Sequence, residues 1–446
     1  MAAARVRHGE GAGLPVIAAL ETGQSLGDGD LRLTFETWES SVRSYCRRFP
    51  VVLTRAKGHM VWDRRGRSYL DFMSGAGALN YGHNHDRLRR ALLRYIEEDG
   101  IAHSLDFHTE AKARFIQEFN RVILAPRGLE YRFQFTGPTG TNAVEAALKV
   151  ARRATGRQSV VAFTNGFHGM TLGALAAAGS RKRRVAAGVP LHEVIRLPFD
   201  GYGRVGFDGL DYLQAALDDP SSGIDAPAAV LLEVVQGEGG LNAASAAWLQ
   251  RVQSICRERG ILFIVDDIQA GCGRTGPFFS FDGLGVQPDI VCLAKSIGGY
   301  GLPLALILIK PWCDRQEPGE HAGTFRGNNL AFVTGAAALS FWTDTAFLDQ
   351  HRMNCDALNE WLQRLPGAWG VQSTPGRGMM RGMAWGDPTI AGKVSAAAFE
   401  RGVIIETCGG SGQVLKLMPP LVIEPEALRS GLRIIAEAIA AVSDDQ

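Results

Sequence analysis

Uninterrupted apolar runs alternate with helical stretches through the middle of the chain. The runs predict strands at 159–163, 228–235, 261–265, 290–294 and 304–309. Strands that are apolar on both faces are typical of a parallel sheet covered by helices. Helical patterns at 142–154 and 246–258 lie between these runs. Residues 91–344 are therefore predicted to form an α/β domain with a mostly parallel central sheet and helices on both faces.

Shorter elements flank this region. Turns at Lys57-Gly58 and Arg65-Gly66 predict short strands within residues 51–72, and a helix is predicted from about Asp86 to Ile96. A long helical stretch at 328–342 precedes residues 345–446, which we interpret as a small α+β domain. Residues 34–90 are expected to form the N-terminal part of that domain. Residues 1–33 lack periodicity and are expected to be a disordered or loosely docked extension, with a transit peptide as the alternative.

Composition narrows the possible partners and the compartment. The 446 residues include 47 basic and 46 acidic side chains, and a net charge of +1 argues against nucleic acid or a membrane surface as the partner. We therefore interpret the basic run at 181–184 as a solvated loop. The 7 cysteines are scattered without a C-x-x-C pair, and no signal peptide is visible. These features predict free thiols in a reducing cytoplasm. The histidines form no metal-ligand pattern, so no metal site is predicted.

Polar side chains follow two of the buried runs, where open α/β sheets bind their ligands. Lys295 follows IVCLA, and burial there favours a neutral amine able to form a Schiff base with an aldehyde. The alternative is a lysine that extends to the surface. Asp266 follows ILFIV, and a carboxylate at this place could bind a protonated ring nitrogen or a metal. The alternative is that Asp266 is a helix cap or an ordinary loop carboxylate.

The stretch GPTGTN, residues 137–142, opens a predicted helix. Glycine and threonine at a helix N-terminus offer N–H groups and a hydroxyl to an anion, usually a phosphate, but the same stretch also makes a plain cap. An amine, a carboxylate and a phosphate cradle at neighbouring element ends together indicate a pyridoxal phosphate site.

Longer motifs around these residues carry a family resemblance. They are IVDDIQAGCGRTG (264–276), AKSIGGYGLP (294–303), NGFHGMTLGAL (165–175), LLEVVQGEGG (231–240) and GTFRGNN (323–329). Together they resemble the class III, ornithine/GABA-type, pyridoxal phosphate aminotransferases, from about residue 35 to residue 441. The resemblance implies fold type I of the pyridoxal phosphate-dependent transferases.

The resemblance also implies roles for individual residues. Lys295 would hold the cofactor aldehyde and move a proton, and Asp266 would keep the ring nitrogen protonated. The other implied cofactor contacts are Gly140 and Thr141 with Thr324 of a neighbouring subunit at the phosphate, Phe167 and Ile268 at the ring faces, and Gln269 at the 3′ oxygen. A shared site implies a homodimer or a higher homo-oligomer.

Four further residues are candidate substrate contacts. Glu238 resembles the gating glutamate of the class, which pairs with a basic residue in one half-reaction and releases it in the other; the matching basic position here is Lys416. Arg326 either meets a substrate carboxylate or pairs with an acid, and Tyr81 either lines the pocket or serves a turn.

Several stretches carry a closer resemblance within the class, and two features in them differ from the usual class III forms: residues 138–142 replace a more acidic loop, and Arg326 stands where glycine is usual. The stretches include SVRSYCRRFP (41–50), SGAGALNYGHNH (74–85) and GTFRGNNLAFVT (323–334). They resemble the diaminobutyrate:2-oxoglutarate aminotransferases of ectoine biosynthesis. This implies transfer of the amino group of L-glutamate to L-aspartate 4-semialdehyde, giving L-2,4-diaminobutyrate and 2-oxoglutarate. The alternatives are another class III omega-aminotransferase, an aminomutase or racemase with the same site, and a ligand-sensing regulator. The regulator would need a DNA-binding module, for which residues 1–33 are too short.

Overall fold

A seven-stranded sheet forms the centre of the chain. The computed structural model describes residues 27–202 and 208–444. The sheet order is β4-β12-β11-β10-β7-β5-β6, and β12 runs antiparallel to both of its neighbours. The strands are β4 (Arg132–Phe135), β5 (Val160–Phe163), β6 (Val194–Leu197), β7 (Ala229–Leu232), β10 (Leu262–Asp266), β11 (Ile290–Leu293) and β12 (Leu306–Ile309).

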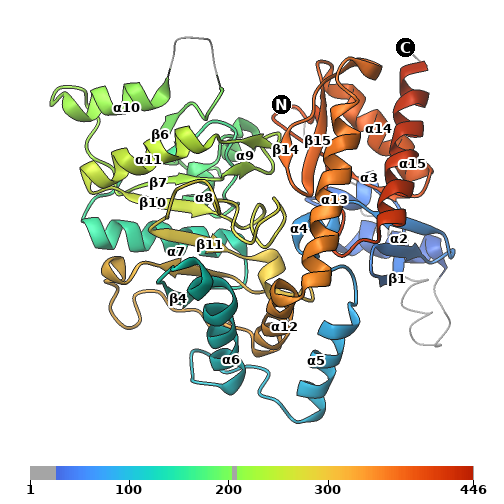
Figure 1. Cartoon of the computed structure of the whole chain (residues 1–446), viewed down its shortest axis with the longest axis horizontal. Coiled ribbons are helices and arrows are strands. Elements are labelled where there is room, and N and C mark those ends of the chain that lie inside the picture. The colour runs from blue at the N-terminus through green and yellow to red at the C-terminus, as the bar shows by residue number, and fades with distance from the viewer. Residues whose placement is uncertain (1–26, 203–207, 445–446) are drawn as a thin grey trace.

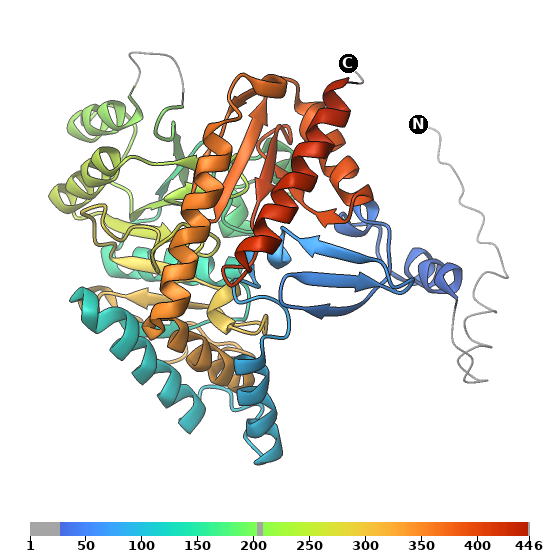
Figure 2. The same ribbon diagram turned by 45° about the vertical axis from the view of Figure 1, so that its right-hand side comes forward.

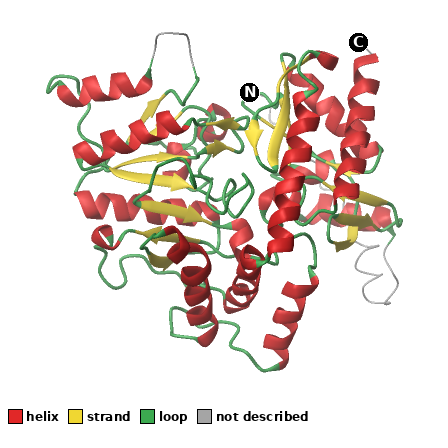
Figure 3. Cartoon of the chain, in the orientation of Figure 1, coloured by secondary structure: helices red, strands yellow, loops and turns green. Residues whose placement is uncertain are grey.

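Helices cover both faces of this sheet (Figure 3). Successive residues of β10 point to opposite faces: Leu262 and Ile264 pack with α7 and α8, whereas Phe263 and Val265 pack with α6, α11 and α12. This is why the strand runs are apolar at every position. The helices of this part are α6 (Glu110–Phe119), α7 (Gly140–Thr155), α8 (Leu172–Ala177), α9 (Arg181–Val185), α10 (Gly209–Asp218), α11 (Ala246–Arg259) and α12 (Asn329–Leu339).

Two smaller sheets lie beside the large one (Figure 1). One has the order β1-β2-β3-β16 and the other the order β13-β15-β18-β17, with β14 paired to β15. Their strands are β1 (Leu53–Lys57), β2 (Met60–Asp63), β3 (Ser68–Asp71), β13 (Val371–Ser373), β14 (Gly376–Arg377), β15 (Met380–Trp385), β16 (Val403–Ile404), β17 (Glu406–Cys408) and β18 (Val414–Leu417). Because β3 pairs with β16, the N-terminal strands lie against the C-terminal elements (Figure 2).

The remaining elements connect or cover these sheets. They are α2 (Asp28–Trp38), α3 (Tyr45–Arg48), α4 (Ser74–Gly77), α5 (Asp86–Glu97), α13 (Thr345–Gln363), α14 (Pro388–Glu400), α15 (Pro425–Asp444) and the hairpin strands β8 (Val235–Gln236) and β9 (Asn242–Ala243). Among the described residues, no helix is long and apolar enough to cross a membrane.

The predicted α/β class and the mostly parallel central sheet are confirmed. The proposed division at residues 34–90, 91–344 and 345–446 remains an interpretation of this arrangement. The first 26 residues of the expected extension lie outside the described part of the chain, and α2 begins at Asp28, so the end of that extension is helical. Strands β4 and β6 have no predicted counterpart, because their short sequences, RFQF and VIRL, contain polar residues.

Candidate active site

Lys295 and Asp266 lie at the same edge of the large sheet. Strands β10 and β11 are parallel neighbours, and Asp266, the last residue of β10, pairs with Cys292. Lys295 follows three positions later, at the start of the turn Lys295–Gly298. The two side chains are close enough to interact electrostatically, with Asp266 favouring the charged form of the amine. The sheet register therefore brings together the amine and the carboxylate that the sequence singled out.

The backbone of Lys295 is held in an uncommon conformation. Its φ of 56° lies in the left-handed region, where a residue with a side chain is strained. The next residue anchors it, because Ser296 Oγ donates to Gly77 O at 2.6 Å and accepts from Asn80 N at 3.2 Å. Burial lowers the pKa of the Lys295 amine, and Glu238 is the main opposing influence. Burial thus favours the neutral, nucleophilic amine.

Asp266 belongs to a buried network of ionisable groups. His168 Nδ1 lies 2.8 Å from Asp266 Oδ2, and both side chains are almost fully buried. Burial opposes a charge on His168, but Asp266 and then Glu233 outweigh it and raise its pKa. Burial raises the pKa of Glu233 to about 7. Asp266 therefore stands next to a histidine whose charged form it favours.

Glu233 also fixes the backbone on either side of the site. Its carboxylate accepts the backbone N–H of Phe167 at 2.9 Å and that of Gly237 at 3.1 Å. Gly237 has no room for a side chain, since a Cβ there would lie 1.8 Å from Gln269 Oε1. Glu233 thus ties the segment of Phe167 to that of Gly237, which packs against Gln269.

Helix α7 points its N-terminus into the site. Thr139 caps the helix, and the backbone N–H groups of Gly140 and Thr141 make no hydrogen bond within the described part of the chain. A Cβ on Gly140 would lie 3.1 Å from Ile268, which places this helix start beside the end of β10. Free N–H groups at the start of a 16-residue helix suit an anion.

Hydroxyl groups surround this helix start. Thr141 Oγ1 lies 2.6 Å from Thr171 Oγ1, which donates to Glu145 Oε1 at 2.6 Å. Gly169 adopts a φ of +135°, and a Cβ there would lie 2.2 Å from Thr141 Oγ1. Only glycine lets the 165–175 segment approach the cradle this closely.

Two further predicted contacts face the same space. Gln269 Nε2 donates to Ala76 O at 3.0 Å, while its buried Oε1 has no partner in the part of the chain that is described. Gly77 lies beside both Gln269 and Lys295, because a Cβ there would meet their side chains at 3.4 and 4.0 Å. The side chains of Gln269 and Lys295 therefore both pass beside Gly77, while the unpaired Gln269 Oε1 lies next to Gly237.

Glu238 joins a buried group of charges. Lys416 is fully buried, with Nζ 2.9 Å from Glu238 Oε1 and 3.0 Å from Glu406 Oε1. Burial disfavours charge on both groups, yet Lys416 lowers the pKa of Glu238 to about 2, and Glu406 and Glu238 raise the pKa of Lys416. One ammonium is thus held between two carboxylates.

The other predicted site residues have different surroundings. Arg326 pairs with Asp106 and donates to His321 O at 2.5 Å, which favours the structural alternative for this arginine. Thr324 is exposed, and its carbonyl contacts His103 Nε2 at 2.8 Å. Tyr81 is buried in the small-sheet core and accepts a hydrogen bond from Trp342 Nε1 at 2.9 Å. This placement favours packing over a substrate contact for Tyr81.

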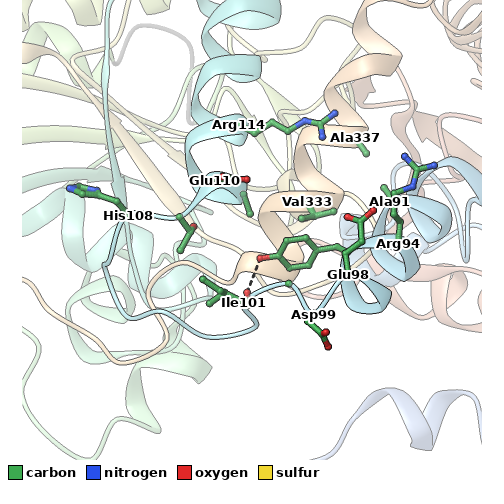
Figure 4. A pocket seen from close by; sticks show the side chains of 14 residues that line it. Ala91, Arg94, Glu98, Asp99, Ile101, His108, Glu110, Arg114, Val333 and Ala337 are labelled. Atoms are coloured by element: carbon green, nitrogen blue, oxygen red, sulfur yellow. Dashed lines mark hydrogen bonds between the residues drawn. The ribbon is translucent and has the colours of Figure 1, made fainter.

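A large surface cavity lies elsewhere. About 600 Å³ in volume, it opens between α5, α6 and α12. Figure 4 shows its lining. One of the lining residues, Tyr95, donates a hydrogen bond of 2.9 Å to Ile101 O. None of the predicted site residues lines it. This cavity is therefore separate from the strand ends that carry Asp266 and Lys295.

The sequence analysis missed three residues that border the site. Glu233 directly follows the strand β7, which ends at Leu232, but the predicted strand continued to residue 235 and so hid this strand end. Glu406 gave no local signal, because only the pairing of β17 with β18 places it opposite Lys416. The interpretation of 181–184 as a solvated loop is wrong for Arg183. This residue lies in helix α9, with Nη2 3.5 Å from Glu238 Oε2.

Known proteins are similar to this chain in sequence and in fold. The family Aminotransferase class-III matches residues 42–439. A diaminobutyrate--2-oxoglutarate transaminase of Halalkalibacterium halodurans is 53% identical over 412 residues, covering 92% of this chain and 96% of the relative. One of Vibrio cholerae is 55% identical over 410 residues, covering 91% and 99%. An ornithine aminotransferase structure from Toxoplasma gondii, 26% identical, superposes with a TM-score of 0.82 over 96% of this chain and 99% of that one. The chain belongs to the class III aminotransferase family.

Proposed function

We propose that this aminotransferase moves the amino group of L-glutamate to L-aspartate 4-semialdehyde, forming L-2,4-diaminobutyrate and 2-oxoglutarate. The observation that carries the proposal is identity of 53 to 55% over more than nine-tenths of the chain to relatives that bear the corresponding name. Ectoine biosynthesis is the proposed pathway, in the cytoplasm, with a homodimer or higher homo-oligomer as the active form.

Pyridoxal 5′-phosphate is the proposed cofactor, and two features of the structure support the fit. The unpaired N–H groups of Gly140 and Thr141 offer a phosphate site, and Gln269, whose buried Oε1 has no partner among the described residues, passes beside Gly77 as Lys295 does. When bound, this cofactor supplies an aldehyde that takes up the amino group and a ring that stabilises a carbanion. Phe167 and Ile268 would contact the ring faces, and Thr324 of a neighbouring subunit would complete the phosphate site.

The residues of the chain perform the remaining work. Lys295 Nζ, whose pKa is lowered by burial, would hold the aldehyde and move a proton at the substrate carbon. Asp266, hydrogen-bonded to His168, would hold a proton on the ring nitrogen. Glu238 and Lys416 are proposed to respond to the differing substrates of the two half-reactions.

A substrate screen tests the proposal. The holoenzyme is supplied with L-glutamate as the donor and with aspartate semialdehyde, glutamate semialdehyde or succinate semialdehyde as the acceptor. We expect the highest kcat/KM with aspartate semialdehyde, measured as 2-oxoglutarate released. Preference for either other aldehyde would instead assign another omega-aminotransferase reaction. Product formation without a keto acid or aldehyde acceptor would assign an aminomutase or racemase. Lys295→Ala is the inactive control.

A further inference from the structure

Arg183 extends from helix α9 into the site. Its guanidinium lies over the Phe167 ring, 4.3 Å from the centroid, and its Nη2 lies 3.5 Å from Glu238 Oε2. Neighbouring Arg181, by contrast, is exposed. The Arg183 side chain retains 37% of its exposure, so it remains open to a molecule from solvent. It therefore presents a cation between the ring-stacking residue and the gating glutamate.

Lys416 is poorly suited to bind a substrate carboxylate. It is fully buried, and two carboxylates already outnumber its single charge. Glu406 lies directly opposite Lys416 in the β17–β18 pair, so the sheet holds this acid in place even when Glu238 moves away. The single charge of Lys416 is already shared by these two acids, which leaves it poorly available to a third carboxylate. The lysine therefore serves to hold Glu238 and not to receive the substrate.

Arg183, unlike Lys416, has hydrogen-bond donors available for a substrate carboxylate. A guanidinium carries five N–H donors in a planar fork that matches a carboxylate. Only one long contact, 3.5 Å to Glu238, occupies its polar atoms in the described structure. The contact with the Phe167 ring holds the guanidinium in place without using those donors. The fork is thus both held and available.

The two amino donors of the proposed reaction share one geometric feature. In L-glutamate the side-chain carboxylate carbon is three bonds from the carbon that bears the reacting amine. In L-2,4-diaminobutyrate, which reacts at its terminal amine, the α-carboxylate carbon is also three bonds from the reacting carbon. One fixed cation can therefore bind the distal carboxylate in both half-reactions.

We propose that Arg183 is the residue that binds this distal carboxylate and so selects substrates that carry it. The proposal rests on the proposed function for the identity of the second donor. For the first donor, the proposal requires only that it be a dicarboxylic amino acid. Arg183 is then a specificity-determining residue, and Lys416 and Glu406 together position Glu238.

Paired donors that differ by the distal carboxylate test the proposal. L-Glutamate is compared with L-2-aminobutyrate, and L-2,4-diaminobutyrate with 1,3-diaminopropane, in single half-reactions of the holoenzyme followed by cofactor absorbance. We expect Arg183→Gln to lower the specificity constant for each carboxylate-bearing donor about 10- to 100-fold, the range for one charge-assisted contact. The loss should appear mainly in the concentration giving half-maximal rate, and the donors without the group should be unaffected. Arg181→Gln, an exposed neighbour in the same helix, is the matched control.

A binding measurement separates recognition from chemistry. Glutarate carries two carboxylates and no amine, so calorimetry with glutarate measures carboxylate binding without the chemical step. We expect weaker glutarate binding in Arg183→Gln and partial recovery in Arg183→Lys, which keeps the charge but loses the fork. Unchanged discrimination between paired donors in Arg183→Gln would overturn the proposal. If the unmodified enzyme rejects aspartate semialdehyde, the proposed function fails, while the glutamate and glutarate measurements still decide the role of Arg183.

Discussion

Asp267 is a buried carboxyl group whose replacement should change the pH dependence of stability. Its Oδ2 accepts the backbone N–H of Ser280 at 3.1 Å, and its Oδ1 has no partner among the described residues. Burial raises the pKa of Asp267 from 3.8 to about 7. The folded protein therefore keeps a proton that the unfolded chain releases at lower pH. The contribution to stability is present below pH 4 and is lost as the pH rises towards 7.

The size of this effect follows from the pKa. At ~1.4 kcal/mol per pH unit, the wild-type protein should lose about 3 kcal/mol from this group between pH 5 and pH 8. For a chain of 446 residues the unfolding entropy is ~0.9 kcal/mol per kelvin, so the loss corresponds to about 3 °C in Tm. Asp267→Asn has no charge to develop and keeps an oxygen for the Ser280 N–H.

Thermal unfolding of the holoenzyme at fixed cofactor concentration measures this effect. We expect the Tm of Asp267→Asn, relative to wild type, to rise by about 3 °C from pH 5 to pH 8. Asp225→Asn, at an exposed position, controls for the general effect of removing one carboxylate. Parallel Tm curves for Asp267→Asn and wild type would refute the assignment of a proton to this group.

Three other substitutions probe the site. Lys295→Ala should abolish turnover and the visible absorbance of the bound cofactor, and a spectrum with an activity assay checks both. Gly169→Ala should weaken cofactor binding and destabilise the fold by about 1–3 kcal/mol, because its Cβ would overlap Thr141; a cofactor titration and unfolding measure this. Glu406→Gln should lower the Tm, since Lys416 would keep only one of its two acids, and an unchanged Tm would show that Glu238 alone suffices.

The sheet and the core of the site could be predicted because they depend on local patterns. Continuous apolar runs predicted five of the seven strands of the large sheet. Asp266 directly follows one of these runs, and Lys295 directly follows the run of the neighbouring strand. The Gly-Thr stretch marked the start of helix α7 to within two residues. In each case the chemistry lies at the end of an element, where the sequence itself shows the boundary.

The remainder of the site depends on pairings between distant segments. Glu406 and Lys416 meet because β17 and β18 are paired, although Glu406 sits in a three-residue strand with no distinctive pattern. Arg183 lies in a run of basic residues whose composition suggested solvent. Its orientation comes from Phe167 and Glu238, which belong to other segments of the chain. Such contacts have no signature in a single sequence.

Glu238 connects three cations, so its movement should have three consequences. It contacts Lys416 and Arg183 and is the main influence that raises the pKa of Lys295 against burial. When Glu238 moves away, Lys416 retains Glu406, Arg183 becomes free for a carboxylate, and the Lys295 amine loses its proton more readily. The Glu238→Gln variant imitates this loss of charge. The rate at which its apoprotein captures pyridoxal phosphate should reach half its maximum at lower pH than in wild type, because the amine is neutral at lower pH. An unshifted midpoint would show that the acid at position 238 does not govern the state of the catalytic amine.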